Sequence, residues 1–291
     1  MNNLPDPISF ESALEKFLIH LKDHQRSTAT SVAYHGDLRQ LHTYLTQKRI
    51  TQATSVQTLH LEEFVAHLST TGYTPKSISR KINSLKTFFK FLHESGLHTA
   101  NPSSPLTHPK YESKAPRILT ATEHRALRDA ARLDIRTSAV IELLLQTGVR
   151  IGELANLRME DLGKNEILVR AFENNSPRTV PLNKTAASAL QNYLNIRPKV
   201  ENDHLFITKT GHPLLVRNIR TAIDRYFRVA GIEGAKVNDL RHTFIAHQLR
   251  SGVHPDLLTT IVGHRRKSST EKYLNYVKIE SPDFTSRLSE L

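Results

Sequence analysis

The chain has 291 residues, with 40 Lys and Arg residues against 28 Asp and Glu residues and a formal net charge of +12. Its length suits two domains, and the basic excess, found on both sides of residue 115, favours a polyanionic partner such as DNA or RNA. Cysteine is absent, which excludes disulfides and thiolate metal sites. No apolar run is long enough to span a bilayer and the start has no signal-peptide pattern, so we expect a cytoplasmic protein without membrane contact.

Apolar residues repeat at helical spacing in four segments of the first hundred residues. Ser9 is placed to cap the first helix, and Pro75 stands in the first turn of the fourth. The four apolar stripes run over Phe10–Leu21, Tyr34–Leu45, Leu61–Leu68 and Ile78–Phe89. This pattern predicts an N-terminal helical domain.

The fourth helix carries a polar and basic face opposite its apolar stripe. Such a face is often only a solvated surface, but in a basic helical domain it is also a candidate for contact with DNA phosphates or the major groove. The DNA-binding candidates on this face are Lys76, Arg80, Asn83, Lys86 and Lys90.

A proline-rich stretch separates the two halves of the chain. Four prolines fall within 15 residues, from Pro102 to Pro116, and such a segment cannot continue a helix. We therefore predict one domain over residues 1–108, a linker over 109–117 and a second domain over 118–291.

The second half mixes helices with one hairpin. Thr120 and Glu123 form a capping-box pattern, and a helix from Ser138 ends at Gly148. Strand-like runs at Ile167–Phe172 and Arg178–Leu182 flank a turn. Further helices are predicted at Thr185–Ile196, Val216–Ala230, Asp239–Ser251 and Pro255–Val262, then one containing Tyr273 and one after Pro282. The expected fold class is mainly α with a small antiparallel β-sheet.

Three short segments contain the residue types that phosphate chemistry needs. Each has an ordinary explanation when taken alone, since an arginine after a glycine is often a surface residue, a histidine can end a helix and a tyrosine can be a half-buried aromatic. The segments are Thr147-Gly-Val-Arg150-Ile-Gly-Glu153, Asn238-Asp-Leu-Arg241-His242-Thr-Phe244, and Gly263-His264 followed nine residues after the histidine by Tyr273.

In this order the three segments resemble those of the tyrosine recombinases, the phage integrase family, and in particular its Xer-like and transposon-encoded members. A Val180-Pro181-Leu182 strand and an Asn101-Pro102 exit from the helical domain strengthen the resemblance, which extends from about Phe10 to Tyr276. It implies a SAM-like core-binding domain and an α+β catalytic domain that act on duplex DNA with no cofactor, neither metal nor ATP.

The resemblance also implies roles for single residues. Arg150 and Arg241 would hold the nonbridging phosphate oxygens, because a guanidinium stays charged and offers paired donors. His264 would donate to the phosphate or help to take the phenol proton, and Tyr273 would attack phosphorus to form a 3′-phosphotyrosyl ester that allows rejoining without ATP. Glu153 would orient an arginine, and the alternative is an ordinary acid on the helix surface.

The sequence departs from the family pattern at two positions. Glu173 stands where a hairpin lysine usually protonates the leaving 5′ oxygen, and we expect a differently placed lysine, or water, to do so here. Asn238 stands where a histidine is common, three residues before Arg241; we include it with the catalytic residues and give His242 a supporting role. Tyr276 is the alternative nucleophile, and the nine-residue step from His264 favours Tyr273.

The expected partners are double-stranded DNA with short inverted-repeat recombination sites and further copies of the chain, in a nucleoid-associated tetramer joined through the tail Ile279–Leu291. Accessory proteins, and the choice between chromosome resolution, transposon resolution and phage integration, stay open. Two other functions also stay open. One is a catalytically impaired DNA-binding relative with an architectural or regulatory role, which Glu173 and Asn238 favour, and the other is a type IB topoisomerase.

Overall fold

The computed structural model describes residues 6–112, 114–172, 175–277 and 288–291. The chain divides into two compact units, Met1–Ser113 and Lys114–Leu291, and each has an apolar core of its own. Most of the regular structure is helical, and in the described ranges one antiparallel sheet of two strands is formed. The predicted fold class is confirmed. None of the helices in the described ranges is long and apolar enough to cross a membrane.

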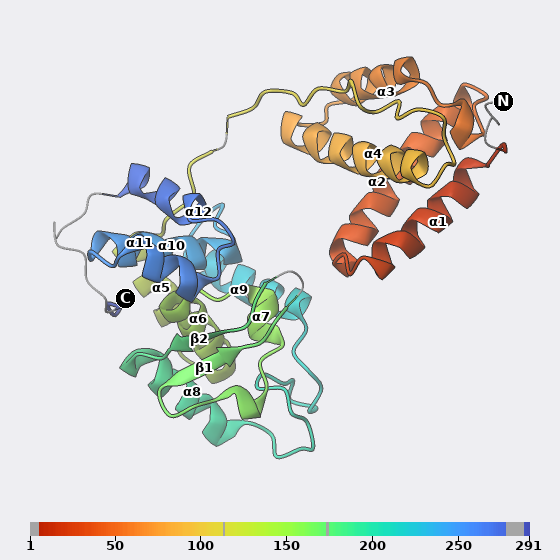
Figure 1. Ribbon diagram of the computed structural model, residues 1–291. Coiled ribbons are helices and arrows are strands. Elements are labelled where there is room, and N and C mark those ends of the chain that lie inside the picture. The colour runs from red at the N-terminus through yellow and green to blue at the C-terminus, as the bar shows by residue number, and fades with distance from the viewer. Residues whose placement is uncertain (1–5, 113, 173–174, 278–287) are drawn as a thin grey trace. The chain divides into compact units, whose positions relative to one another are not determined.

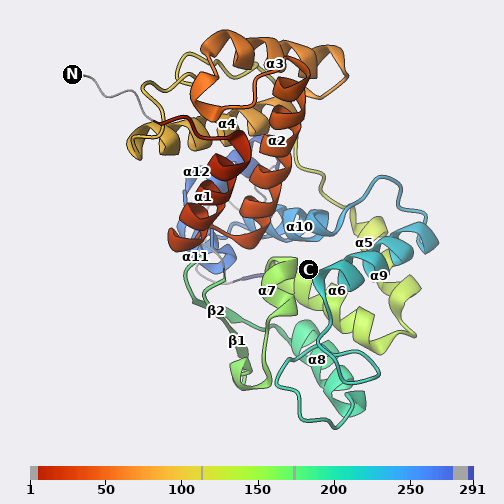
Figure 2. The same cartoon turned by 90° about the vertical axis from the view of Figure 1, so that its right-hand side faces the viewer.

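The first unit contains the four predicted helices. Ser9 caps the first by accepting a hydrogen bond from the backbone N–H of Ser12, and Thr74 caps the fourth, which has proline in its first turn. The first two helices run side by side in both views, and both contact the fourth (Figures 1 and 2). The helices are α1 (Phe10–Asp23), α2 (Thr28–Gln47), α3 (Thr58–Thr70) and α4 (Pro75–Glu94), with a 3-10 turn η1 (Ala53–Ser55).

Burial of one face of α4 determines which of its residues face water. Phe88 lies within 5.3 Å of the rings of Phe10 and Phe17, measured between centroids, and Ile82 and Leu85 are fully buried beside it. Removal of this much apolar surface from water fixes the rotation of the helix about its axis. The basic positions at the opposite phase are therefore held outward.

The second unit is built from shorter helices around one central helix. Its predicted capping box is present, because the Thr120 hydroxyl accepts from the Glu123 backbone N–H and the Glu123 carboxylate accepts from the Thr120 N–H. The helices are α5 (Ala121–Ala131), α6 (Ile135–Thr147), α7 (Ile151–Ala155), α8 (Lys184–Ile196), α9 (Val216–Val229), α10 (Val237–Arg250), α11 (Pro255–Val262) and α12 (Ser268–Glu271), with 3-10 turns η2 (Met159–Asp161) and η3 (Lys272–Tyr276).

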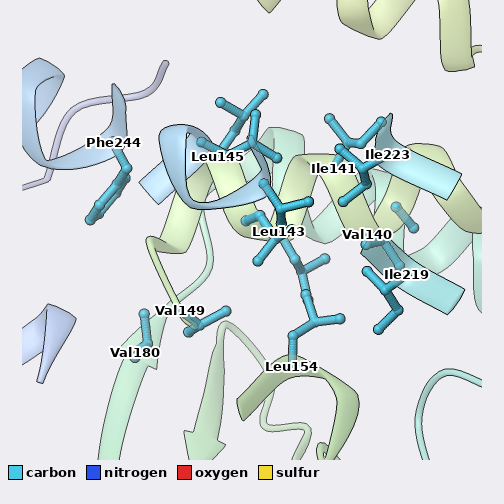
Figure 3. Packing of buried hydrophobic residues seen from close by; sticks show 14 of the residues in the cluster. Val140, Ile141, Leu143, Leu145, Val149, Leu154, Val180, Ile219, Ile223 and Phe244 are labelled. Carbon is cyan, nitrogen blue, oxygen red and sulfur yellow. The ribbon is translucent and has the colours of Figure 1, made fainter. Parts of the chain in front are cut away.

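Helix α6 is the central element of the second unit. Every residue from 139 to 147 is buried, and the helix contacts α5, α8, α9 and α10 (Figure 1). Figure 3 shows its side chains Val140 and Ile141 beside Ile219 and Ile223 of α9. The helix ends at Gly148, whose φ of +62° is left-handed, and a Cβ there would lie 2.3 Å from the Phe244 ring. Only glycine fits this turn.

The predicted hairpin is present but shorter. Strands β1 (Glu166–Val169) and β2 (Arg178–Pro181) pair antiparallel, with Val169 opposite Arg178. The first strand ends three residues before the predicted end, because Arg170 would next face Pro177 in this register and proline has no N–H for the ladder. Phe172 and Asn175 pair again in the same register, with backbone hydrogen bonds of 3.3 and 3.0 Å. Residue Glu173, at the usual position of the hairpin lysine, lies outside the described residues.

The predicted helix around Tyr273 is present, and at the tyrosine it is of the 3-10 type. Helix α12 covers only Ser268–Glu271, and the tyrosine belongs to the 3-10 turn η3. The tighter i to i+3 winding accompanies burial of the Tyr273 ring, which is 2% exposed. The helix predicted after Pro282 lies mostly outside the described ranges, and residues 288–291 are not helical.

Candidate active site

Arg150 is the N-cap residue of α7, directly after the left-handed turn that ends α6. Its backbone N–H donates to a Glu153 carboxylate oxygen at 2.8 Å, and its Nη1 donates to the other oxygen at 2.9 Å. Its Nη2 donates to the Gly263 carbonyl at 2.9 Å. The side chain is 32% exposed, so guanidinium surface is open to a ligand.

Arg241 lies on α10 and is only 6% exposed. Its guanidinium donates to the Gly148 carbonyl, and its Nη2 donates to the Val262 carbonyl at 2.7 Å. Burial lowers the pKa of Arg241 to about 9, and the nearby positive charge of Arg150 is the second cause. The guanidinium therefore remains cationic at neutral pH. Both guanidiniums are thus held by the carbonyls at the end of α11, which lack partners within that helix.

Glu153 is buried at 3% exposure and joins two arginines. Besides Arg150 it accepts hydrogen bonds from Arg178, from Nη1 at 3.0 Å and from Nη2 at 2.7 Å. Burial pushes the pKa of the carboxyl upward, but the Arg178 hydrogen bonds and the two positive charges outweigh burial and hold the pKa below its ordinary value. Glu153 is therefore a charged, buried orienter of arginines in this structure.

Arg178 is the residue that the sequence analysis missed. Its Nε also donates to the Ile261 carbonyl at 2.7 Å, and its side chain is 6% exposed. One signal was available, because Arg178 has the same strand phase as the core residue Val180, and an inward-facing charge needs a buried partner. Glu153 is that partner.

His264 follows Gly263, at a position where the backbone conformation and the nearby Arg178 side chain leave no room for a larger residue. The φ of Gly263 is +67°, and a Cβ there would lie 2.8 Å from the Arg178 guanidinium carbon. The His264 backbone N–H donates to the Thr259 carbonyl at 3.0 Å, and its Nδ1 lies 2.8 Å from the Thr270 hydroxyl. Burial first, then the charges of two nearby arginines, lower the pKa of this histidine to about 3. The imidazole is therefore neutral.

The hydrogen bonds of Thr270 favour one tautomer of His264. The Thr259 hydroxyl donates to the Thr270 oxygen at 2.7 Å, which leaves the Thr270 hydroxyl proton for Nδ1 of His264. A neutral imidazole that accepts at Nδ1 carries its proton at Nε2. In this arrangement the Nε2–H group of His264 can donate to an anion.

Tyr273 is buried with its hydroxyl against α10. The Oη atom lies 2.5 Å from Nδ1 of His242, and Nε2 of the same ring lies 2.7 Å from Nδ2 of Asn238. Burial raises the pKa of Tyr273 to about 12. The alternative nucleophile, Tyr276, is 43% exposed and lines a surface cavity together with His247.

The basic face of α4 belongs to the first unit. Lys76, Asn83 and Lys90 are exposed, and Lys86 is half-buried. Arg80 is exposed but forms a two-point ion pair with the buried carboxylate of Asp37. The structure thus leaves most of the predicted face open to solvent and gives Arg80 a structural partner.

No group of three or more His, Asp or Glu side chains within the described ranges is arranged to hold a metal ion. The groups that gather at the end of α11 are instead cationic or neutral donors. Such a set suits the binding of an anion through hydrogen bonds and charge.

Comparison with known proteins shows two family models that match this chain, one in each half. The model of the phage integrase family matches residues 111–278, and that of the phage integrase N-terminal SAM-like domain matches residues 14–96. This chain belongs to the phage integrase family. A tyrosine recombinase of Pseudothermotoga lettingae is 32% identical over 278 residues, 94% of this chain and 95% of the relative. Tyrosine recombinase XerC of Staphylococcus carnosus is 30% identical over 282 residues, 94% and 92% of the two chains.

Solved structures give the same fold for this tyrosine recombinase. XerA recombinase superposes with a TM-score of 0.53 at 27% identity, over 91% of this chain and 93% of the other. A lambda integrase dimer bound to a COC′ core site gives a TM-score of 0.75 at 15% identity, over 98% and 81% of the two chains. At that identity the likeness shows the fold alone.

Proposed function

We propose that this tyrosine recombinase cleaves and rejoins duplex DNA with Tyr273 as nucleophile and with Arg150, Arg241 and His264 as the groups that hold the scissile phosphate. One observation carries the proposal. The two guanidiniums converge on the carbonyls at the end of α11, and the next residue is His264, whose Nδ1 contacts the Thr270 hydroxyl at 2.8 Å. The charge of Arg241 also acts on the Tyr273 hydroxyl.

The chemistry follows from these groups. A bond forms between Oη of Tyr273 and phosphorus as the bond from phosphorus to the 5′ oxygen breaks, which leaves a 3′-phosphotyrosyl ester. Charge that builds on the nonbridging oxygens is met by preorganised donors, and one such donor contributes about 3–4 kcal/mol in well-studied enzymes. Because the ester retains a phosphate ester bond, a free 5′ hydroxyl reverses the attack without ATP.

The leaving 5′ oxygen still needs a proton. Glu173 occupies the usual lysine position, so the donor in this proposal is a lysine from elsewhere or water. Lys272 is one candidate, because its ammonium lies 5.5 Å from the centroid of the Tyr273 ring. A substrate with a 5′-bridging sulfur has a leaving group that needs no acid, so it should restore cleavage to a variant that lacks the true donor.

We assign residues 1–108 to a core-binding domain, 109–117 to a linker and 118–291 to a catalytic domain. The exposed α4 residues Lys76, Asn83 and Lys90 then contact the backbone or the major groove of a short inverted-repeat site. The protein acts in the cytoplasm on nucleoid DNA. A lambda integrase tetramer has been solved on a Holliday junction, and a tetramer is the assembly we propose here.

The chain tail supports an assembly role. The backbone of Ser289 exchanges hydrogen bonds with the fully buried amide of Gln248, and Leu291 does the same with Gln146. Buried amides of this kind are costly to leave unpaired, at about 1–3 kcal/mol each. In the proposed tetramer a neighbour's tail satisfies the same two glutamines.

Covalent trapping tests the proposal. Binding sites are first selected from a random duplex library, then rebuilt with a nick moved one nucleotide at a time, so that cleavage releases a short strand and cannot be reversed. Wild-type protein and a Tyr276→Phe variant should form a denaturant-resistant adduct, and Tyr273→Phe should not. Specific binding without any adduct would instead support a catalytically impaired relative. An adduct that survives in Tyr273→Phe would overturn the choice of nucleophile.

A further inference from the structure

The hydroxyl of Tyr273 has one hydrogen-bond partner within the described ranges, and that partner is a histidine. Nδ1 of His242 lies 2.5 Å from Oη, and the two rings are tilted by 38° with centroids 5.8 Å apart. His242 follows Arg241 on α10, so one helix turn positions both a phosphate-binding guanidinium and an imidazole. A proton can leave the phenol directly along this short contact.

Asn238 lies one helix turn earlier and faces the other ring nitrogen. Its Nδ2 is 2.7 Å from Nε2 of His242. With the nitrogen of the amide toward the ring, Nε2 accepts and Nδ1 carries the proton. Because an amide is nearly symmetric in shape, rotation by half a turn presents its oxygen instead. Nε2 then carries the proton and Nδ1 is free to accept from Tyr273.

The charged groups that face the imidazole leave it neutral. Burial lowers the pKa of His242; Asp239 opposes this effect, and the cations Lys272 and Arg241 add to it. His264 also interacts with His242 and is itself neutral. A neutral imidazole in hydrogen-bond contact with a phenol is a competent proton acceptor at neutral pH.

His264 is a poorer candidate for the same task. Its Nδ1 is engaged by the Thr270 hydroxyl, and the remaining nitrogen, Nε2, carries a proton in that arrangement. It can donate to a phosphate but has no free lone pair for the phenol proton. With the oxygen of the Asn238 amide toward the ring of His242, the two histidines of the site suit opposite tasks.

We propose that His242 is the general base for Tyr273, and that Asn238 is a positioning residue that holds the accepting tautomer. As the bond from Oη to phosphorus forms, the phenol proton passes to Nδ1 of His242, and the electron pair of the broken bond leaves with the 5′ oxygen, which takes its proton from solvent or a nearby acid. In rejoining, the protonated imidazole returns the proton to the departing Tyr273. This inference rests on the proposed function.

Single-turnover cleavage of the nicked DNA tests it. His242→Ala and His242→Gln should bind DNA as the wild type does and cleave about 10²–10⁴-fold more slowly, the usual contribution of a general base. Glutamine at this position can still hydrogen-bond the phenol but cannot take its proton. Added imidazoles should restore cleavage by His242→Ala, with rates that rise with the pKa of the imidazole.

The tautomer is tested at Asn238. Asn238→Ala should cleave more slowly than the wild type. Asn238→Asp, whose carboxylate can only accept from Nε2, should cleave faster than Asn238→Ala and move the inflection of the pH–rate profile upward, because a negative charge raises the pKa of His242. Exposed His212 offers a matched control, and His212→Ala should cleave at the wild-type rate.

The outcomes separate this inference from the proposed function. No adduct with wild-type protein contradicts the proposed function itself. An adduct that requires Tyr273 but forms at the wild-type rate in His242→Ala overturns the general base alone. Slow cleavage that no imidazole restores, with an unmoved pH profile in Asn238→Asp, assigns His242 a structural role and also overturns the inference.

Discussion

The buried carboxylate of Glu153 offers the sharpest prediction about how the site is held together. It accepts four hydrogen bonds, two from Arg150 and two from Arg178. Glu153→Gln keeps the shape but removes the charge, and it turns one acceptor into a donor that faces guanidinium donors. Loss of one partner of a buried ion pair costs about 3–5 kcal/mol, because the remaining charge stays buried.

At about 2–4 °C per kcal/mol for a unit of this size, that loss lowers Tm by roughly 10 °C. The matched control is Glu160→Gln, since Glu160 pairs with Arg170 at the surface, where the two side chains are 63% and 46% exposed. A surface pair contributes about 0–1 kcal/mol, so the control should hardly move Tm. Thermal denaturation followed by circular dichroism measures both.

The same carboxylate predicts a dependence on pH. Its folded-state pKa is lowered, so the unfolded chain takes up the proton first as pH falls. The stabilisation is present at neutral pH, declines below the ordinary carboxyl value of 4.5, and is lost once the pH falls below the folded-state pKa. The Tm difference between wild type and Glu153→Gln should therefore narrow toward acid. Equal Tm values for the two proteins at pH 7, or equal losses in Glu153→Gln and Glu160→Gln, would refute the reasoning.

Three further predictions concern the turn, the DNA surface and metals. Gly263→Ala should lower both the stability and the cleavage rate, because its Cβ would collide with the Arg178 side chain. The control Gly231→Ala has nearly the same φ, +68°, and no atom within 4 Å of the added Cβ, so it should cost only about 1 kcal/mol of backbone strain. Equal Tm losses in the two variants would contradict this reasoning. Lys76→Ala should reduce the slope of log affinity against log salt by about 1, measured by fluorescence anisotropy, while an exposed lysine on α1, Lys16, should not. EDTA should leave the yield of covalent adduct unchanged, and a loss that added Mg²⁺ restores would point to a metal in the reaction.

Several elements were predictable because their signals are local. Ser9, Thr120 and Glu123 cap helices through side chains that reach only three residues along the chain, so sequence neighbours decide the contact. The apolar repeats likewise depend on helix geometry alone. Where a signal is short, as in β1, the predicted length was wrong.

Sequence alone determined the family, the helical fold class and the residues worth testing, because these depend only on the types of side chain and their order along the chain. The tertiary structure decided what those side chains do to one another. The pairing of Glu153 with Arg178 joins residues 25 apart, and the contact of His242 with Tyr273 joins residues 31 apart. Neither spacing follows from any local repeat. Which proton each imidazole carries depends on such contacts, because a buried polar group takes its partner from whatever the packing of α10, α11 and the hairpin brings within reach.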